Sequence, residues 1–212
     1  MSSQPMTDPV SLPLQTRVNP VESVDAQARK VEVVFTTGAA VRRRRYTGWE
    51  TSVPFDEILT VSREAVNLER LNAGAPALDS HSIWSTFSQV GVIESARIDG
   101  GKGLATIRFP SKGVDERADR MFSLVAEGII RNVSVGYTLN EVRVETPEKV
   151  GEVEKRIATR WTPHEISFVT VPADAGAQVR SADTMDLYPC IVTRSSSHAA
   201  ALARMRMRQL GI

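Results

Sequence analysis

Residues 129–137 read Ile-Ile-Arg-Asn-Val-Ser-Val-Gly-Tyr, a stretch typical of a β-strand inside a packed sheet. Side chains alternate between the two faces of a strand, so Val133 and Val135 lie on one face. The opposite face carries small or polar side chains, those of Asn132, Ser134 and Gly136. A glycine two positions from Ser134 removes a side chain from that face, which would let a substrate backbone approach the serine.

Strand patterns also occur on both sides of this stretch. Residues 90–98 and 104–109 are separated by Asp-Gly-Gly-Lys-Gly, and because glycine adopts positive φ readily, we expect an antiparallel hairpin there. Further strands are predicted at 31–37, 139–144 and 165–171. The pattern indicates a mainly β or α+β domain.

Helical spacing is clearest over residues 114–127. Apolar side chains recur there on one helical face, and Gly128 is a suitable residue to end the helix. Residues 54–59 and 61–71 also contain helical spacings, and we expect a helix over the second of these ranges. The four arginines at 42–45 are interpreted as a solvated loop, with a patch for an anionic partner as the alternative.

The chain of 212 residues is long enough for one domain with a segment at each end. Residues 1–28 mix Ser, Pro, Gln and Asp without periodicity, which predicts a flexible N-terminal arm. Residues 29–180 are expected to form the domain. Residues 181–212 are polar and end in a basic run, so we expect a C-terminal tail that is flexible or removed by cleavage.

Composition argues against several classes of function. There are 26 basic and 25 acidic residues, and aromatic residues make up 6%, so nucleic-acid binding is not expected. The single cysteine, Cys190, has no partner for a disulfide or a thiolate zinc site. Signal-peptide and membrane-spanning patterns are absent. We therefore expect a cytosolic, soluble protein that binds neither metal nor cofactor nor membrane.

Nucleophilic hydrolysis needs a hydroxyl or thiol, a base that takes its proton, and a group that orients the base. Histidine is the usual base, and the chain contains three: His81, His164 and His198. His198 lies in the polar C-terminal segment, which leaves the first two as candidates. His81 lies in a short polar segment before a strand, where a side chain is held by the scaffold yet open to substrate.

A carboxylate could complete such a site in the strand predicted at 165–171. Strand alternation places Glu165 and Ser167 on one face, and Ile166 and Phe168 on the other. If the apolar face packs into the core, Glu165 points to the opposite surface and could bind a histidine ring nitrogen.

Three motifs together resemble the tailed-phage prohead maturation proteases, over roughly residues 30–180. They are Leu-Asp-Ser-His-Ser at 78–82, Asn-Val-Ser-Val-Gly-Tyr at 132–137, and Glu-Ile-Ser-Phe-Val-Thr-Val-Pro-Ala-Asp at 165–174. The resemblance implies a closed or partly open antiparallel β-barrel with flanking helices, similar to the herpesvirus assembly proteases. It implies a serine endopeptidase that works inside the immature capsid, in the bacterial host cytoplasm. Its substrates would be scaffold segments of the major capsid protein, together with its own chain through self-association or autocleavage.

By position, the resemblance makes His81 the general base, Ser134 the nucleophile and Glu165 the third member. The family pattern usually has Asp after the base histidine, whereas Ser82 stands there in this chain. The herpesvirus enzymes use a second histidine as third member, so His164 is the alternative to Glu165. We prefer Glu165, because it shares a strand face with polar Ser167. Donors for the oxyanion are suggested near residues 128–132, with Arg131 and Asn132 as candidates.

Two other functions compete with this interpretation. One is a non-enzymatic capsid-assembly or scaffolding protein with the same barrel, in which the polar motifs are solvated strand faces. The other is a cytosolic hydrolase of small esters or amides. The Gly-x-Ser-x-Gly turn of the α/β-hydrolases is absent, because Val133 and Val135 flank Ser134.

Overall fold

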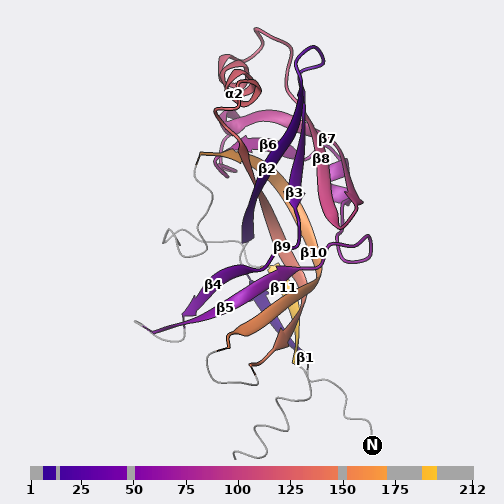
Figure 1. Cartoon of the computed structure of the whole chain (residues 1–212), viewed down its shortest axis with the longest axis vertical. Helices are drawn as coiled ribbons and strands as arrows, with labels where there is room; N and C mark the ends of the chain where they lie inside the picture. The colour runs from indigo at the N-terminus through magenta and orange to yellow at the C-terminus, as the bar shows by residue number, and fades with distance from the viewer. Residues whose placement is uncertain (1–6, 13–14, 47–50, 148–151, 171–187, 195–212) are drawn as a thin grey trace, which may run out of the picture.

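The computed structural model describes residues 7–12, 15–46, 51–147, 152–170 and 188–194, and it is mostly β (Figure 1). The strands are β1 (Thr7–Leu12), β2 (Gln15–Asp25), β3 (Lys30–Thr36), β4 (Val41–Tyr46), β5 (Ser52–Leu59), β6 (Pro76–Asp79), β7 (Gln89–Asp99), β8 (Lys102–Arg108), β9 (Asn132–Glu145), β10 (Glu154–Val169) and β11 (Tyr188–Arg194). The helices are α1 (Glu69–Asn72), α2 (Glu116–Ala126) and the 3₁₀ turn η1 (Thr86–Ser88).

The strands form one mixed sheet in the order β1-β11-β9-β2-β3-β8-β7-β6-β10-β5-β4, with a further pairing between β9 and β10. The expectation of an antiparallel sheet is therefore corrected. β10 pairs in parallel with β5 and β6, and β11 pairs in parallel with β9. The two longest strands, β9 and β10, run side by side and antiparallel through the centre of the molecule (Figure 1).

The hairpin predicted around residue 100 is confirmed. β7 and β8 are antiparallel from Val92–Arg108 to Asp99–Lys102, which leaves Gly100 and Gly101 as the loop. Both glycines have positive φ, 53° and 74°, a conformation that the loop demands and that a Cβ would strain.

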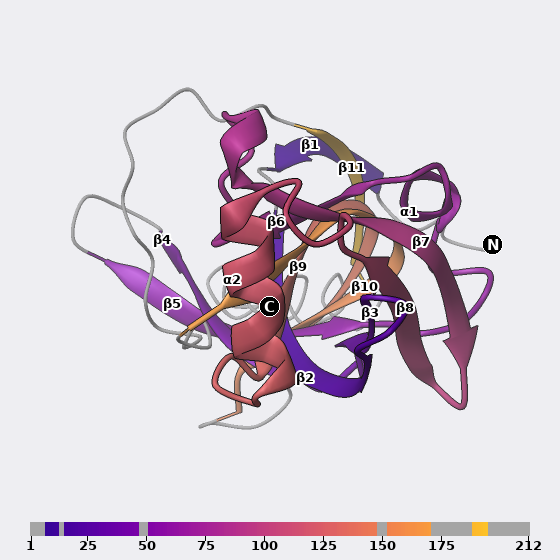
Figure 2. The same cartoon turned by 90° about the horizontal axis from the view of Figure 1, so that it is seen from above.

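The helix predicted over 114–127 is confirmed as α2. The Asp115 carboxylate accepts hydrogen bonds from the backbone N–H groups of Arg117 and Ala118, which caps its first turn. Gly128 follows its end with φ of 69°, as expected. The buried face consists of Ala118, Met121, Phe122 and Val125, and Figure 2 shows α2 lying over one end of the sheet.

Parts of the predicted terminal segments are ordered strands. The expectation of an arm over residues 1–28 is wrong for β1 and β2, because β2 pairs with both β3 and β9 and so satisfies its backbone in the sheet. β11 falls within the predicted tail 181–212 and lies between β1 and β9. The remainder of that tail lies outside the described residues.

The helix predicted over 61–71 is wrong, since only α1 forms. The segment before it instead makes a parallel bridge to β10: Trp161 N donates to Ala65 O, and Asn67 N donates to Trp161 O. Residues 54–59, which carried helical spacing, belong to strand β5. Tertiary pairing overrides the local pattern in both places.

The arginine block at 42–45 is likewise not a loop, because it belongs to β4 and pairs with β5. Arg42 binds Asp56, while Arg43 Nε donates to Glu57 at 2.9 Å. Glu57 is buried, and Arg43 also donates to the buried Tyr137 hydroxyl. Strand alternation thus sends two neighbouring arginines to different carboxylates.

The core lies between these elements and is rich in aromatic side chains. Trp161 packs edge-on against Tyr137 and Phe35, and Phe109 contacts Phe122 and Phe168. Val133, Val135, Ile166 and Phe168 are buried, so the apolar faces of β9 and β10 point into the core as predicted.

Candidate active site

The pairing of β9 with β10 brings two sequence motifs together on one face. Ser134 lies opposite Ser167, and Gly136 lies opposite Glu165. Because paired residues in a sheet project to the same side, the side chains of Ser134, Ser167 and Glu165 share that face. All three residues are buried, with exposed fractions of 2% or less.

A register shift in β10 gives Glu165 this direction. Pro163 pairs with Tyr137 and Glu165 pairs with Gly136, so His164 is an additional residue with no partner position on β9. A bulge of this kind redirects the side chains on one side of it. Without it, Glu165 would not share a face with Ser134.

His81 reaches this face from the turn that follows β6. That strand runs parallel to β10, and the chain then turns over Asp79, Ser80, His81 and Ser82, with Ser82 N donating to Asp79 O. Ser80 and His81 have positive φ, 54° and 57°, as in type I′ turns that usually contain Asn and Gly. Such a conformation costs about 1–3 kcal/mol for each non-glycine residue.

Hydrogen bonds to β10 hold the turn in this conformation. Ser80 N donates to Phe168 O at 3.1 Å, and His81 N donates to Ser167 Oγ at 3.0 Å. The backbone of His81 is therefore fixed against the same strand that carries Glu165.

His81 and Glu165 make a short hydrogen bond, with 2.6 Å between Nδ1 and Oε1. The second carboxylate oxygen accepts a hydrogen bond from Ser167 Oγ, also at 2.6 Å. An ionised carboxylate only accepts hydrogen bonds, so this contact assigns the proton of neutral His81 to Nδ1. Nε2 is then left with its lone pair, the form that a general base requires.

The structure does not join Ser134 to His81 by a hydrogen bond. Ser134 Oγ and His81 Nε2 are both buried, and among the described residues they are the only buried side-chain nitrogen or oxygen atoms without a hydrogen-bond partner. Buried polar atoms are nearly always satisfied, because leaving one unpaired costs about 1–3 kcal/mol. The two exceptions are the atoms that a Ser–His pair would connect.

His164, the alternative third member, lies in a different environment. Its Nε2 is 3.0 Å from Thr138 Oγ1, and its ring lies 5.7 Å from that of Tyr188. Burial, with a contribution from the charge of Arg70, lowers the pKa of His164 below its ordinary value. Of the two candidates, Glu165 is the one that contacts His81.

Gly136 has a different role from the one expected. A Cβ at this position would lie 2.2 Å from Glu165 Oε1, so the glycine makes room for the carboxylate and not for a substrate backbone. Sequence reasoning also missed the two hydrogen bonds of Ser167. Its position two residues after Glu165 on the same strand face was the available signal.

Replacing Gly136 with Ala is expected to disable the site. Glu165 is buried and held by two hydrogen bonds, so the new methyl group would force it away from His81. Under the peptidase function proposed below, kcat/KM should fall by at least about 100-fold, as for displaced catalytic groups. The free energy of unfolding should fall by about 1–3 kcal/mol. Peptidase kinetics and urea denaturation measure the two effects.

Gly103→Ala is the matched control, because its Cβ would lie 2.5 Å from the ring of Phe35, in another part of the sheet. It should lower stability while activity per folded molecule is retained. Normal activity of Gly136→Ala would show that Glu165 can move without consequence.

The contacts of Arg131 and Asn132 do not support their suggested role as oxyanion donors. Arg131 Nε donates to the backbone carbonyl of Gly128, and Arg131 O accepts from Val21 N. The Arg131 guanidinium thus stabilises the turn after α2. Asn132 is half-buried and begins β9 opposite Val169.

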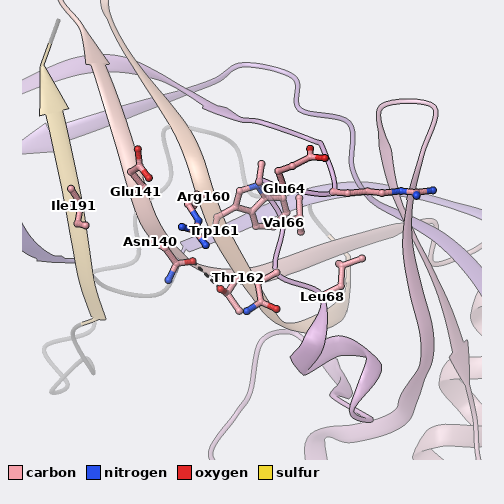
Figure 3. Close-up of a pocket in the computed structure, with 12 residues that line it drawn as sticks. Glu64, Val66, Leu68, Asn140, Glu141, Arg160, Trp161, Thr162 and Ile191 are labelled. Carbon is pink, nitrogen blue, oxygen red and sulfur yellow. Dashed lines mark hydrogen bonds between the residues drawn. The ribbon is translucent and has the colours of Figure 1, made fainter.

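Two hollows on the surface are lined in part by residues of β10. One, of about 270 Å³, adjoins it and is lined by Arg70, Pro76, Leu78, Ile83, Ser85, Thr86, Gln89, His164, Glu165 and Tyr188. Another, of about 530 Å³, lies between the segment before α1 and the β9–β10 ladder (Figure 3). Its floor includes the hydrogen bond from Thr162 to Asn140. None of His81, Ser134 and Glu165 lines this second hollow.

The described residues lack two features that would point to other classes of function. They contain no cluster of three or more His, Cys, Asp or Glu side chains that could hold a metal ion. In the same parts of the chain, no helix has the length and apolar character needed to cross a bilayer.

Comparison with known proteins agrees with the motifs. A "Major capsid protein" of Halomonas phage phiHAP-1 is 40% identical over 119 residues, which are 56% of this chain but only 19% of that protein. No solved structure gives a significant match. Residues 71–189, more than half of the chain, match the family described as caudovirus prohead serine protease. The chain belongs to this prohead serine protease family.

Proposed function

We propose that this protein is a serine endopeptidase of prohead maturation, in which Ser134 is the nucleophile, His81 the general base and Glu165 its orienting carboxylate. The observation that carries the proposal is the pair of unsatisfied buried atoms, Ser134 Oγ and His81 Nε2, beside the His81–Glu165 hydrogen bond. A hydrogen bond between the two side chains would satisfy both atoms. Such contacts are often long before substrate binds.

The reaction follows from these roles. His81 Nε2 takes the Ser134 proton as Oγ attacks the scissile carbonyl carbon, and Glu165 stabilises the resulting imidazolium through Nδ1–H. The imidazolium then gives its proton to the amide nitrogen, the C–N bond breaks, and an acyl-serine ester remains. Water, deprotonated by His81, attacks the ester and releases the carboxylic acid product with Ser134 restored.

Ser167 is a weaker candidate for the nucleophile, although it lies opposite Ser134. Its hydroxyl already donates to Glu165 Oε2 and accepts from His81 N. Attack by Ser167 would break the contacts that hold the base and its carboxylate. The Ser134 hydroxyl makes no hydrogen bond within the described residues, so its attack would break none of these contacts.

The proposal includes a partly open barrel of the herpesvirus assembly-protease type. Its support is the pairing of β9 with both β2 and β10, which links seven strands in a ring: β9, β2, β3, β8, β7, β6 and β10. The site would lie where β9, β10 and the turn after β6 meet.

The proposed substrate is a polypeptide, namely scaffold segments of the major capsid protein and also the enzyme's own chain through self-association or autocleavage. Three large apolar side chains follow His81 and are exposed, those of Ile83, Trp84 and Phe87. Exposed apolar groups of this size are typical of protein contact surfaces. We place the reaction inside the immature capsid, in the host cytoplasm, where confinement raises the effective substrate concentration.

The alternative is a non-enzymatic capsid-assembly protein, which the name of the phiHAP-1 relative and the burial of Ser134 favour. Co-expression with the capsid protein of the same phage distinguishes the two functions. A fluorophosphonate probe should attach to Ser134, as located by tryptic mass spectrometry, and the capsid protein should be truncated. Intact capsid protein together with an unlabelled chain would support the non-enzymatic function.

A further inference from the structure

Ser167 contacts both His81, the proposed base, and Glu165, its carboxylate, but it takes no part in the proposed proton transfers. Its side chain is fully buried. The hydroxyl donates to Glu165 Oε2 at 2.6 Å and accepts the backbone N–H of His81 at 3.0 Å. A single oxygen therefore links the strand that carries the acid to the turn that carries the base.

The two hydrogen bonds of Ser167 restrict different motions, one of the Glu165 carboxylate and the other of the His81 backbone. Glu165 Oε1 is held by His81, but rotation about the last side-chain bond of Glu165 is stopped only when Oε2 is also held. His81 has the left-handed conformation at φ of 57°, which persists only when its surroundings impose it. The bond from His81 N to Ser167 Oγ anchors the His81 backbone to strand β10.

The consequence concerns the tautomer of His81. When the carboxylate faces Nδ1 squarely, the proton of neutral His81 resides on Nδ1 and Nε2 stays available as a base. If the carboxylate rotates or the turn relaxes, imidazole regains its freedom to carry the proton on Nε2, which cannot then accept a proton from Ser134.

We infer that Ser167 is a positioning residue, which holds the Glu165 carboxylate and the His81 backbone in the geometry that keeps the proton of neutral His81 on Nδ1 and Nε2 free to act as a base. This inference rests on the proposed function for its kinetic consequence. Its structural consequence, the tautomer of His81, is measurable without any activity.

The test compares Ser167→Ala with Thr138→Ala. Thr138 is a suitable control, because it is also a buried hydroxyl residue in the β9–β10 ladder, and its hydrogen bond goes to His164 and not to His81. Ser167→Ala should lower kcat roughly 10–100-fold with little change in KM, as expected for misaligned catalytic groups. Thr138→Ala should stay within about threefold of wild type, below the rate loss associated with misalignment. Ser167→Thr, which restores a hydroxyl, should recover part of the rate.

The second readout is the ¹⁵N NMR spectrum of histidine-labelled protein in a Ser134→Ala background, with the His81 signals assigned by His81→Gln. Before Ser167 is replaced, neutral His81 should carry its proton on Nδ1. After Ser167→Ala, the signals should move toward the Nε2–H form, whereas Thr138→Ala should leave them unchanged.

An unchanged His81 tautomer in folded Ser167→Ala would overturn the inference, whatever the activity. An inactive wild-type enzyme with the predicted tautomer shift would instead refute the proposed function and leave the positioning role intact. Circular dichroism and urea denaturation establish that each variant is folded, and if Ser167→Ala unfolds, Ser167→Cys replaces it in the same comparison. A Cys variant with the wild-type tautomer and rate would also contradict the role, because a thiol is a weak hydrogen-bond partner.

Discussion

Ser134→Ala is expected to abolish cleavage of the capsid protein without destabilising the fold. Removal of a serine nucleophile lowers kcat/KM by at least about 10⁴-fold. The same substitution deletes a buried hydroxyl that has no hydrogen-bond partner among the described residues. Removing such a group relieves its desolvation cost, so the free energy of unfolding should stay constant or rise by about 1 kcal/mol. Loss of function with unchanged or greater stability is typical of a catalytic residue and unusual for a core residue.

The measurements are gel and mass analysis of capsid protein co-expressed with each variant, and urea denaturation of the purified chains. Ser95→Ala is the matched control, because Ser95 is an exposed serine on strand β7, and it should cleave like wild type. If Ser134→Ala still truncates the capsid protein, the nucleophile is another residue. If Ser134→Ala loses several kcal/mol of stability, the hydroxyl has a structural role.

Glu165→Gln is expected to give the second largest loss, with kcat lower by about 10³–10⁴-fold, because a carboxamide no longer fixes the proton of His81 on Nδ1 or stabilises the imidazolium. The side chain keeps its size and can still bind Ser167, so the fold should survive. His164→Gln is the comparison variant. Its ring contacts Thr138 and Tyr188, and we expect its activity to remain within about threefold of wild type.

The two variants are compared by single-turnover cleavage of a peptide from the capsid protein and by thermal unfolding. An inactive His164→Gln beside an active Glu165→Gln would transfer the third position to His164. Equal, severe losses in both would indicate that the bulge at His164 is needed to direct Glu165. His164→Ala would then test whether the loss comes from the His164 side chain or from the backbone bulge at that position.

Local patterns predicted correctly those elements whose stability is local. The β7–β8 hairpin depends on two glycines with positive φ, and α2 depends on an apolar face, an Asp115 cap and a terminal Gly128. In both cases the residues that determine the backbone are neighbours in the chain. Strand alternation likewise predicts that Ser134 and Glu165 lie on the polar faces of their strands, and the pairing of β9 with β10 places both faces on the same side of the sheet.

Elements defined by distant partners were predicted wrongly. β2 has few alternating apolar residues, and its order comes from pairing with β3 and β9. The run of four arginines in β4 predicts a solvated loop, but Asp56 and Glu57 on β5 bind Arg42 and Arg43. Residues 61–68 carry helical spacing but bridge to Trp161, because sheet pairing and burial there outweigh a weak local preference.

The sequence by itself determined the β-rich class, the hairpin and α2, the family resemblance, and the order of His81, Ser134 and Glu165. Tertiary structure alone decided the parallel pairing of β6 with β10 and the bulge that turns Glu165 toward His81. It also showed that Gly136 leaves space for the Glu165 carboxylate. Nor could the sequence reveal that one hydroxyl, that of Ser167, joins acid and base. The physical reason is that propensity and alternation act between neighbours along the chain, whereas register, bulges and close approaches depend on which strands meet.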